Sequence, residues 1–300
     1  MTINLYSNLA KVKNYLNFDN TEASANTVDD ATLVNFINRA SRAVDTYTRR
    51  KFYPRYETRY YDFIDSKFIR LDDDLLSLSA LRTQNGASLV SSSALFLQTG
   101  DNYNRGPFDK IVLKIDTGSV LQYSGTVQKA NEVEGWWGYH EDYPNAWVDT
   151  GTSLLTDYLA SAGSINLAGA GSFGTGASDR FGEHPRISVG DLLKIKEQYF
   201  HVLAPGSAGN NIALVAPYAN GTSGASAGSG ASIAKFYYEP DIEWATRRLA
   251  TWLYGGRDTP FQSKTAFVQL GTIEIPVALA VDVKAKLERF KRRTFTTFPK

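Results

Sequence analysis

Residues 47–63 read YTRRKFYPRYETRYYDF, and the period of the apolar residues changes within this stretch. Upstream of it, apolar side chains recur every three or four residues from Leu33 to Tyr47, which predicts an amphipathic helix led by Asp29. The basic residues at 49–51 suit the C-terminal end of a helix dipole, and Pro54 ends the helix. From Arg55 to Phe63 aromatic and charged residues alternate, which predicts a half-exposed strand.

Helices are also predicted near both ends of the chain. Apolar residues recur at helical spacing from Leu5 to Leu16, and Asn4 is positioned to cap that helix. Near the C-terminus, Pro240 begins a helix that ends at Gly255, with Trp252 on its apolar face. A small hairpin is expected over 267–275, and Pro276 occupies the first turn of a last helix.

Downstream of Phe63 the sequence predicts a series of short strands. The Asp-Asp-Asp run at 72–74 is expected to form a solvated turn, and Gln-Asn-Gly at 84–86 a hairpin turn. The strands expected around these turns are 68–71, 75–83, 88–96, 111–115, 120–123 and 127–135.

The region 150–236 differs from the rest in composition. It holds 14 of the chain's 24 glycines, with two nearly low-complexity tracts at 168–178 and 220–232. Short strand-like runs lie around these tracts, so the region predicts a small barrel or sandwich with long glycine-rich surface loops. The runs are 165–167, 186–189, 192–195, 199–203 and 212–217.

The composition excludes several kinds of chemistry. The 300-residue chain contains no cysteine, so it has no disulfide, thiolate metal site, iron–sulfur cluster or cysteine nucleophile. Three histidines leave little for zinc or for general-base catalysis. The 32 basic and 31 acidic residues nearly cancel, which argues against a surface devoted to nucleic acid. No apolar run is long enough for a membrane span, and the N-terminal segment does not resemble a signal peptide.

The motifs that could carry chemistry are weak. Residues 169–174 match the dinucleotide pattern GxGxxG, but no helical pattern follows them, so a chance match in a glycine-rich tract is preferred. The consecutive residues 140–142 cannot all face one site, His184 lies in a loop, and His201 fits a barrel wall. The run at 72–74 lacks the glycine and glutamate of a calcium loop. We therefore expect no catalytic, cofactor-binding or metal-ligating residue.

The C-terminal stretch carries a dense basic cluster, which leads into a segment with two phenylalanines and no helical pattern. Such a segment suits docking on another protein, and proximity to DNA or a plain solvated tail stay open as alternatives. The basic residues of the cluster are Lys284, Lys286, Arg289, Lys291, Arg292 and Arg293.

The order of these elements resembles the head–tail connector (adaptor or head-completion) proteins of tailed bacteriophages. The phrase at 47–52 is similar to the family's "Y-T-x-R-x-F" helix end, and Trp137-Gly138-Tyr139 to its "W-G-Y" strand end. The helix over 240–257, the hairpin and the final helix complete the likeness. The resemblance covers 1–148 and 237–300, and the family's simpler members lack the 149–236 region.

The resemblance implies an α+β fold, with a helical bundle core, a small antiparallel β sheet and an inserted glycine-rich all-β barrel or sandwich. Its domains would be an adaptor core of 1–148 and 237–300, the β domain of 149–236, and an extended basic tail of 291–300. The implied role is structural, not enzymatic. By this resemblance, a ring of usually about twelve copies would lie under the portal at the head–tail interface of the virion, after assembly in the host cytoplasm.

The resemblance also implies partners. These are the portal, tail, stopper or terminator proteins, further copies of the chain, and capsid or fibre proteins at 149–236, with packaged DNA passing nearby and no membrane. Candidate residues of the portal-docking tail are Lys291, Arg292, Arg293, Phe295, Phe298 and Lys300. Candidate residues of the ring interface, chosen for their aromatic and charged pattern, are Arg55, Tyr56, Arg59, Tyr60 and Tyr61.

Two other classes of protein remain as alternatives to this interpretation. One is another tail or baseplate structural protein with a peripheral binding β domain. The other is an enzyme with a glycine-loop ligand site, for which Asp179, Glu183, His184 and Asp191 are the nearby ionisable residues.

Overall fold

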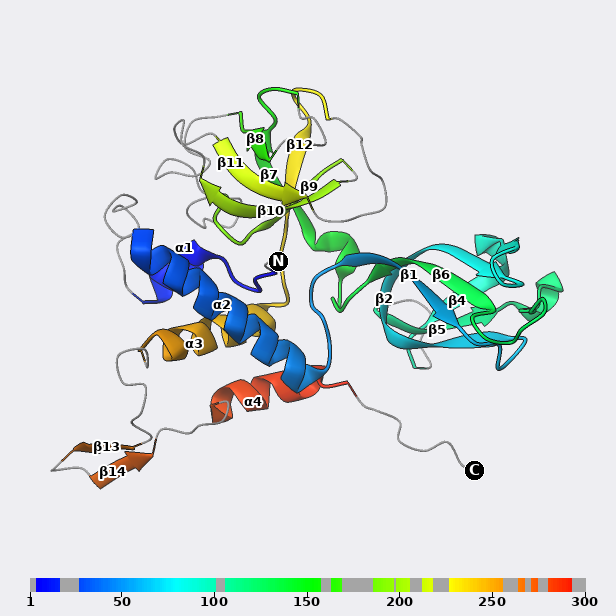
Figure 1. Ribbon diagram of the computed structural model, residues 1–300, viewed down its shortest axis with the longest axis horizontal. Coiled ribbons are helices and arrows are strands. Elements are labelled where there is room, and N and C mark those ends of the chain that lie inside the picture. The colour runs from blue at the N-terminus through cyan, green and yellow to red at the C-terminus, as the bar shows by residue number, and fades with distance from the viewer. Residues whose placement is uncertain are drawn as a thin grey trace. The chain divides into compact units, whose positions relative to one another are not determined.

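The computed structural model describes residues 4–16, 27–100, 106–157, 163–168, 186–196, 198–205, 212–217, 227–255, 264–267, 271–274 and 280–292. These residues form two six-stranded antiparallel sheets, one two-stranded sheet and four α-helices (Figure 1). The chain divides into two compact units, and the described residues of one of them lie in 50–148. The other unit contains the four helices and the second large sheet.

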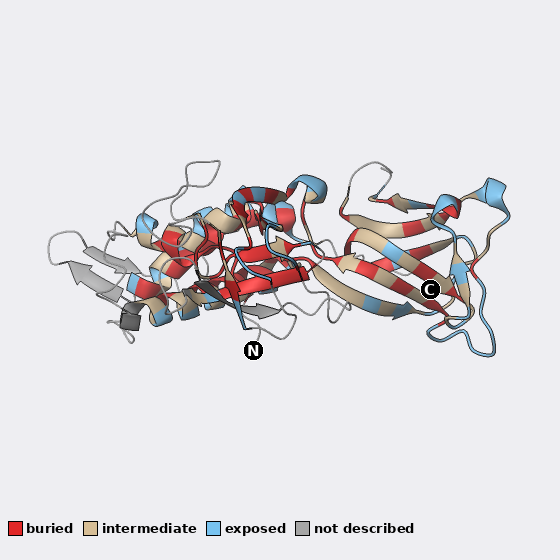
Figure 2. Ribbon diagram, turned by 90° about the horizontal axis from the view of Figure 1, so that it is seen from above, coloured by how far each residue is buried: buried red, intermediate tan, exposed pale blue. Residues whose placement is uncertain are grey.

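The unit of residues 50–148 is built on one sheet, which we call the open sheet. Its strand order is β1-β6-β2-β5-β4, and β3 pairs with the far end of β2. Burial alternates strictly along β6, as a sheet with one covered face requires (Figure 2). The strands are β1 (Arg55–Tyr61), β2 (Phe68–Thr83), β3 (Ser88–Val90), β4 (Leu95–Gln98), β5 (Phe108–Leu113) and β6 (Asn131–Trp137).

The covered face of the open sheet has its own apolar core. Trp137 is fully buried there beside Leu75, Leu81 and Val133. The next residue, Gly138, has φ +147°, and a Cβ there would lie 2.5 Å from the carbonyl oxygen of Tyr53. The Trp-Gly-Tyr phrase therefore has a local physical reason, because only glycine fits where the chain leaves β6.

The strand β2 corrects one prediction. Asp72–Asp74 do not form a turn, because they lie inside this sixteen-residue strand, where the register against β5 shifts between Arg70 and Leu75. The Gln84–Gly86 turn is confirmed, with positive φ at all three residues. The predicted strand 120–123 is not a strand, and the predicted 127–135 strand is β6, displaced towards Trp137.

The second large sheet has the order β7-β12-β9-β10-β11-β8. A bridge between Leu154 and Leu167, flanked by backbone hydrogen bonds from Leu155 to Asn166 and from Ala168 to Ser153, joins its two outermost strands. We call it the closed sheet, because these contacts make it a small barrel. Its strands are β7 (Trp147–Ser153), β8 (Ser164–Asn166), β9 (Leu192–Ile195), β10 (Gln198–Pro205), β11 (Ile212–Pro217) and β12 (Ser232–Phe236). The predicted strand at 186–189 is absent.

The helices are α1 (Leu9–Tyr15), α2 (Thr27–Thr48), α3 (Pro240–Gly255) and α4 (Val281–Leu287), and α4 continues into the 3₁₀ turn η4 (Glu288–Phe290). The cap of α1 is Asn8 and not Asn4, since the Asn8 side chain accepts from the N–H of Lys11. Trp252 was predicted on the apolar face of α3 but is 45% exposed.

The smaller elements complete the described structure. A two-stranded hairpin pairs β13 (Lys264–Phe267) with β14 (Gly271–Glu274). Three further 3₁₀ turns lie in the unit of residues 50–148, namely η1 (Ser92–Ala94), η2 (Ile115–Thr117) and η3 (Tyr143–Asn145).

The predicted fold class is wrong. The described residues are mostly β, with two large antiparallel sheets, and they contain no helical bundle core. The helical prediction failed because α1 and α4 are seven residues each, too short to build a bundle. The strands from 55 to 137, expected to be a small accessory sheet, instead enclose a core of their own.

Candidate functional site

The strand β1 carries the five residues predicted for a ring interface, and it sends them to two faces. Arg55, Arg59 and Tyr61 share the face of the buried Trp137, where the Arg59 guanidinium lies 4.2 Å from the Trp137 ring centroid. Tyr56 and Tyr60 lie on the opposite face. The structure therefore separates the predicted set instead of bringing it to one surface.

An arginine–aspartate cluster occupies the covered face. Asp73 accepts hydrogen bonds from Arg55 at 2.6 Å and from Arg59 at 3.0 Å. Arg59 also reaches Asp72 at 3.1 Å, and Tyr61 donates its hydroxyl proton to Asp72. The three aspartates predicted as a solvated turn are thus counterions of arginines that precede them in the chain, with Arg50 bonded to Asp74 at 2.6 Å.

Burial and neighbouring charges together shift pKa values within this cluster. Burial opposes ionisation of Asp73, but the N–H of Asp74 and the two guanidinium groups outweigh it, so its pKa lies below the ordinary value. Burial is the largest cause that raises the pKa of Tyr61, and its hydrogen bond to Asp72 raises that pKa further. A carboxylate held ionised by two arginines is structural, because it is a poor proton acceptor at neutral pH.

The opposite face of β1 is aromatic and acidic. Tyr56 donates to Glu134 at 2.8 Å, and its ring lies 5.1 Å from that of Trp136. Arg82 bonds both Glu132 and Glu134, which leaves one more acid than base in this group. We call Tyr56, Thr58, Tyr60, Glu132, Glu134 and Trp136 the outer face of β1 and β6. Tyr60 is 56% exposed, so this face is accessible.

The base of the C-terminal tail lies against the end of α2. The N–H of Arg292 donates to the carbonyl of Thr48 at 2.8 Å. The Tyr47 hydroxyl donates to Glu288 at 2.7 Å, and the Lys291 ammonium lies 5.4 Å from the Tyr47 ring centroid. Of the predicted tail residues, Arg293, Phe295, Phe298 and Lys300 lie outside the described residues.

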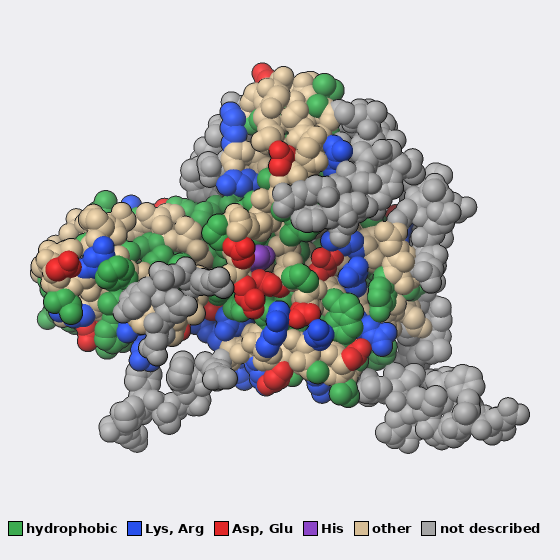
Figure 3. All heavy atoms as spheres, turned by 180° about the vertical axis from the view of Figure 1, so that it is seen from behind, with side chains coloured by type: hydrophobic (Ala, Val, Ile, Leu, Met, Phe, Trp, Pro, Cys, Tyr) green, Lys and Arg blue, Asp and Glu red, His purple; other side chains and the backbone are tan. Residues whose placement is uncertain are grey.

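Several cations of the C-terminal basic cluster form ion pairs with acidic side chains in the fold. Lys286 and Arg289 both pair with Asp241 of α3, at 3.3 Å and 3.1 Å. Lys291 pairs with Glu288 at 3.5 Å. Acidic and basic side chains are likewise intermingled on the face that Figure 3 shows. This mixing disfavours the DNA-proximity alternative for α4, because phosphate binding needs unpaired cations.

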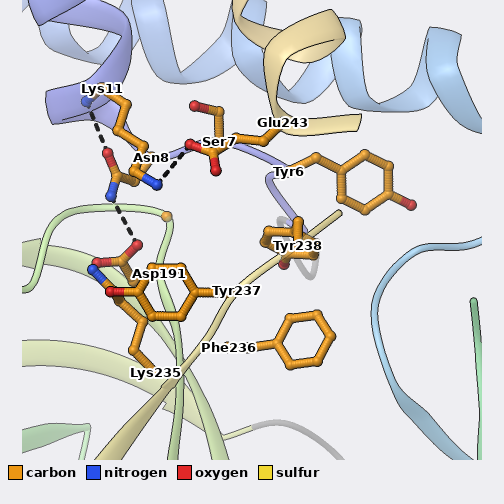
Figure 4. Close-up of a pocket in the computed structure, with 11 residues that line it drawn as sticks. Tyr6, Ser7, Asn8, Lys11, Asp191, Lys235, Phe236, Tyr237, Tyr238 and Glu243 are labelled. Atoms are coloured by element: carbon orange, nitrogen blue, oxygen red, sulfur yellow. Dashed lines mark hydrogen bonds and ion pairs between the residues drawn. The ribbon is translucent and has the colours of Figure 1, made fainter. Parts of the chain in front are cut away.

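A small pocket lies where the N-terminal segment, the closed sheet and α3 meet (Figure 4). Asn8 donates to Asp191 at 2.9 Å, and the Lys11 ammonium lies 2.7 Å from Glu243. The space in which the centre of a water molecule could lie is about 10 Å³, which is near the minimum for one water molecule. The pocket therefore works as a polar joint that fixes the N-terminal segment, and it has no room for a substrate.

The remaining candidates for chemistry carry structural contacts. His201 is 1% exposed in β10, and burial lowers its pKa to about 4, so it is neutral at physiological pH. The His140 ring accepts from the N–H of Asp142. Across the described ranges no three His, Asp or Glu residues are grouped as metal ligands. The glycine loop 169–174, Asp179, Glu183 and His184 lie outside the described residues.

The arginine–aspartate cluster is the arrangement that sequence reasoning missed. Its signal was present, since basic residues at 50, 55 and 59 match three consecutive acids at 72–74. The three arginines are five and four residues apart, so they do not follow the two-residue period of a strand. Their partners lie where the register of β2 shifts. A search for alternation therefore does not reveal the pairing.

The comparisons with known proteins add no relative. No protein-family model, curated protein or solved structure matches the chain. None of the helices in the described ranges is long and apolar enough to cross a membrane.

Proposed function

We propose that this chain is a structural subunit of a tailed-phage head–tail connector, in which copies form a ring beneath the portal and join it to the tail. The observation that carries the proposal is the anchored base of the C-terminal tail. The Arg292–Thr48 and Tyr47–Glu288 bonds hold the last helical turn against α2. A basic, aromatic segment that leaves a fixed point is suited to docking on a neighbouring protein.

The accessible surfaces of the chain also support an assembly role. A closed ring uses heterologous contacts, so each copy must present two different complementary surfaces. The outer face of β1 and β6 offers Tyr56, Tyr60 and Trp136 as one of them, and the tail offers another. In this proposal the ring extends the DNA channel, and the near-neutral charge of the chain keeps the channel weakly interacting with DNA.

The closed sheet has a separate place in the proposal. It forms a peripheral binding module that contacts capsid or fibre proteins, and its long connecting segments are rich in glycine, which suits surface loops. No enzymatic step is assigned to any residue of the chain.

Assembly state and portal binding test the proposal. The purified chain, mixed with the portal of the same particle, is expected to give a ring whose mass is a multiple of 33.1 kDa, bound to the portal. A chain that stays monomeric and does not bind the portal under any assembly condition contradicts the proposal.

A further inference from the structure

The strand β1 is a seven-residue edge strand of the open sheet. All seven residues pair with β6, from Arg55 opposite Trp137 to Tyr61 opposite Asn131. No strand within the described residues pairs with its other side. Every second residue of such a strand directs its N–H and C=O groups away from the sheet, where they can pair with another chain.

Several of the usual devices that protect an edge are missing from β1. Its pairing with β6 has no bulge, and the strand contains neither proline nor lysine, since Pro54 precedes it. The two arginines do not guard the edge, because Arg55 and Arg59 are held by Asp73 on the covered face. The exposed side of the strand is instead Tyr56, Thr58 and Tyr60, which favours strand pairing.

The chain itself contains a segment that matches this edge. Residues 293–300 read RTFTTFPK, in which threonine and phenylalanine favour the extended conformation and the charged side chains are basic. Fully extended, the segment spans roughly 26 Å, enough to cover all of β1. Its cations suit the outer face of β1 and β6, where Glu132 and Glu134 outnumber Arg82.

We propose that the C-terminal segment 293–300 of one copy adds as a strand to the free edge of β1 in a neighbouring copy. Main-chain hydrogen bonds give the affinity, and side chains on alternate faces give the specificity. Phe295 and Phe298 then lie on opposite faces, so one of them meets the Tyr56–Tyr60 row and the other the Tyr61 side of the strand. This inference rests on the proposed ring, and it names the second copy, not the portal, as the partner of the tail.

Disulfide trapping tests the proposal directly, because the chain has no cysteine of its own. The variant Thr58→Cys is mixed under assembly conditions with Phe295→Cys in one sample and with Phe298→Cys in another, because one of the two phenylalanines faces Thr58, and each mixture is oxidised. In one of the two mixtures we expect a crosslinked dimer about tenfold or more above the matched control, in which Leu89→Cys, exposed on β3, replaces Thr58→Cys. A segment docked on β1 raises the local thiol concentration only at Thr58.

Three results overturn the proposal, and each is distinguishable from failure of the proposed function. Equal crosslinking at Thr58 and Leu89 shows random collision. Crosslinking only within a single chain that carries both cysteines shows that the segment docks on its own β1. Rings that bind the portal without a crosslink from Thr58 to residue 295 or 298, and lose the portal when 293–300 is deleted, place the segment on the portal and leave the connector role intact. Absence of both rings and portal binding contradicts the connector role itself.

Discussion

The open and closed sheets of this chain each have six strands, and they treat their edges in opposite ways. In the closed sheet the Leu154–Leu167 bridge joins the outermost strands, and both leucines belong to its buried core. In the open sheet β1 keeps one unpaired side and carries aromatic residues towards solvent. Closing a sheet removes the template for strand addition, and leaving it open keeps that template. We therefore propose that copies of the chain assemble through the open sheet.

The largest expected effect comes from truncating one buried aromatic side chain in each sheet, which tests whether the two cores are independent. Trp137→Ala removes a fully buried indole from the open sheet and should cost about 3–5 kcal/mol, and Phe200→Ala should do the same in the closed sheet. Hydrogen exchange followed by mass spectrometry should show each loss in the peptides of its own sheet. If either variant raises exchange equally in both sheets, the two cores are not independent.

The second prediction distinguishes the two sheets by the pH dependence of their stability. The His201 pKa is about 4 in the folded chain and 6.5 in the unfolded chain, so only the unfolded state binds the proton between these values. Stability of the closed sheet is therefore full above pH 6.5 and falls by about 3 kcal/mol as the pH drops to 4. Urea titrations across this window should show that His201→Gln lacks this loss. A variant that keeps the full acid dependence rules out His201 as its source.

The open sheet should respond to acid in a lower range. Because the Asp73 pKa is depressed in the folded state, its contribution is present above the unfolded value of 3.8 and is lost as the pH falls through the folded value. At neutral pH, Asp73→Asn should cost about 2 kcal/mol, since it removes one of the two carboxylates that Arg55 and Arg59 share and leaves them only Glu57 in common. Urea unfolding measures this cost, with Asp116→Asn, on the η2 turn of the same unit, as the matched control. Equal costs for the two variants would mean that the cluster adds nothing.

The smallest expected effect concerns the base of the tail. Tyr47→Phe removes the hydroxyl that bonds Glu288 at an exposed site, so we expect a loss of about 0.5 kcal/mol or less in global stability. The local consequence is easier to detect, as faster tryptic cleavage after Lys291 and Arg292. Tyr123→Phe, an exposed tyrosine of the other unit, serves as the control. An unchanged cleavage rate argues that Arg292–Thr48 alone holds the base.

Residue spacing and turn composition were enough to predict a strand, a hairpin turn and a helix. The alternation from Arg55 to Phe63 is β1, the Gln84–Gly86 turn is where the sequence places it, and Pro240 begins α3, which ends at Gly255. These features depend on residues close in sequence, where period and turn chemistry decide.

The parts that depend on distant partners were not predicted. Asp72–Asp74 have turn composition, yet Arg50, Arg55 and Arg59 neutralise them inside β2. The predicted helical bundle gave too much weight to two short helices, because nothing in a helix pattern reveals that a neighbouring sheet builds its own core. Likewise, the aromatic and charged residues of β1 were grouped as one surface, and only the sheet shows which of them face the arginine–aspartate cluster.

The most direct test of the connector role is an electron-microscopic reconstruction of the particle that carries this chain. We predict a ring of copies directly beneath the portal, with density continuing from the end of η4 along the free side of β1 in the adjacent copy. Density for the chain at any other place in the particle, or a position beneath the portal as isolated copies, would contradict it.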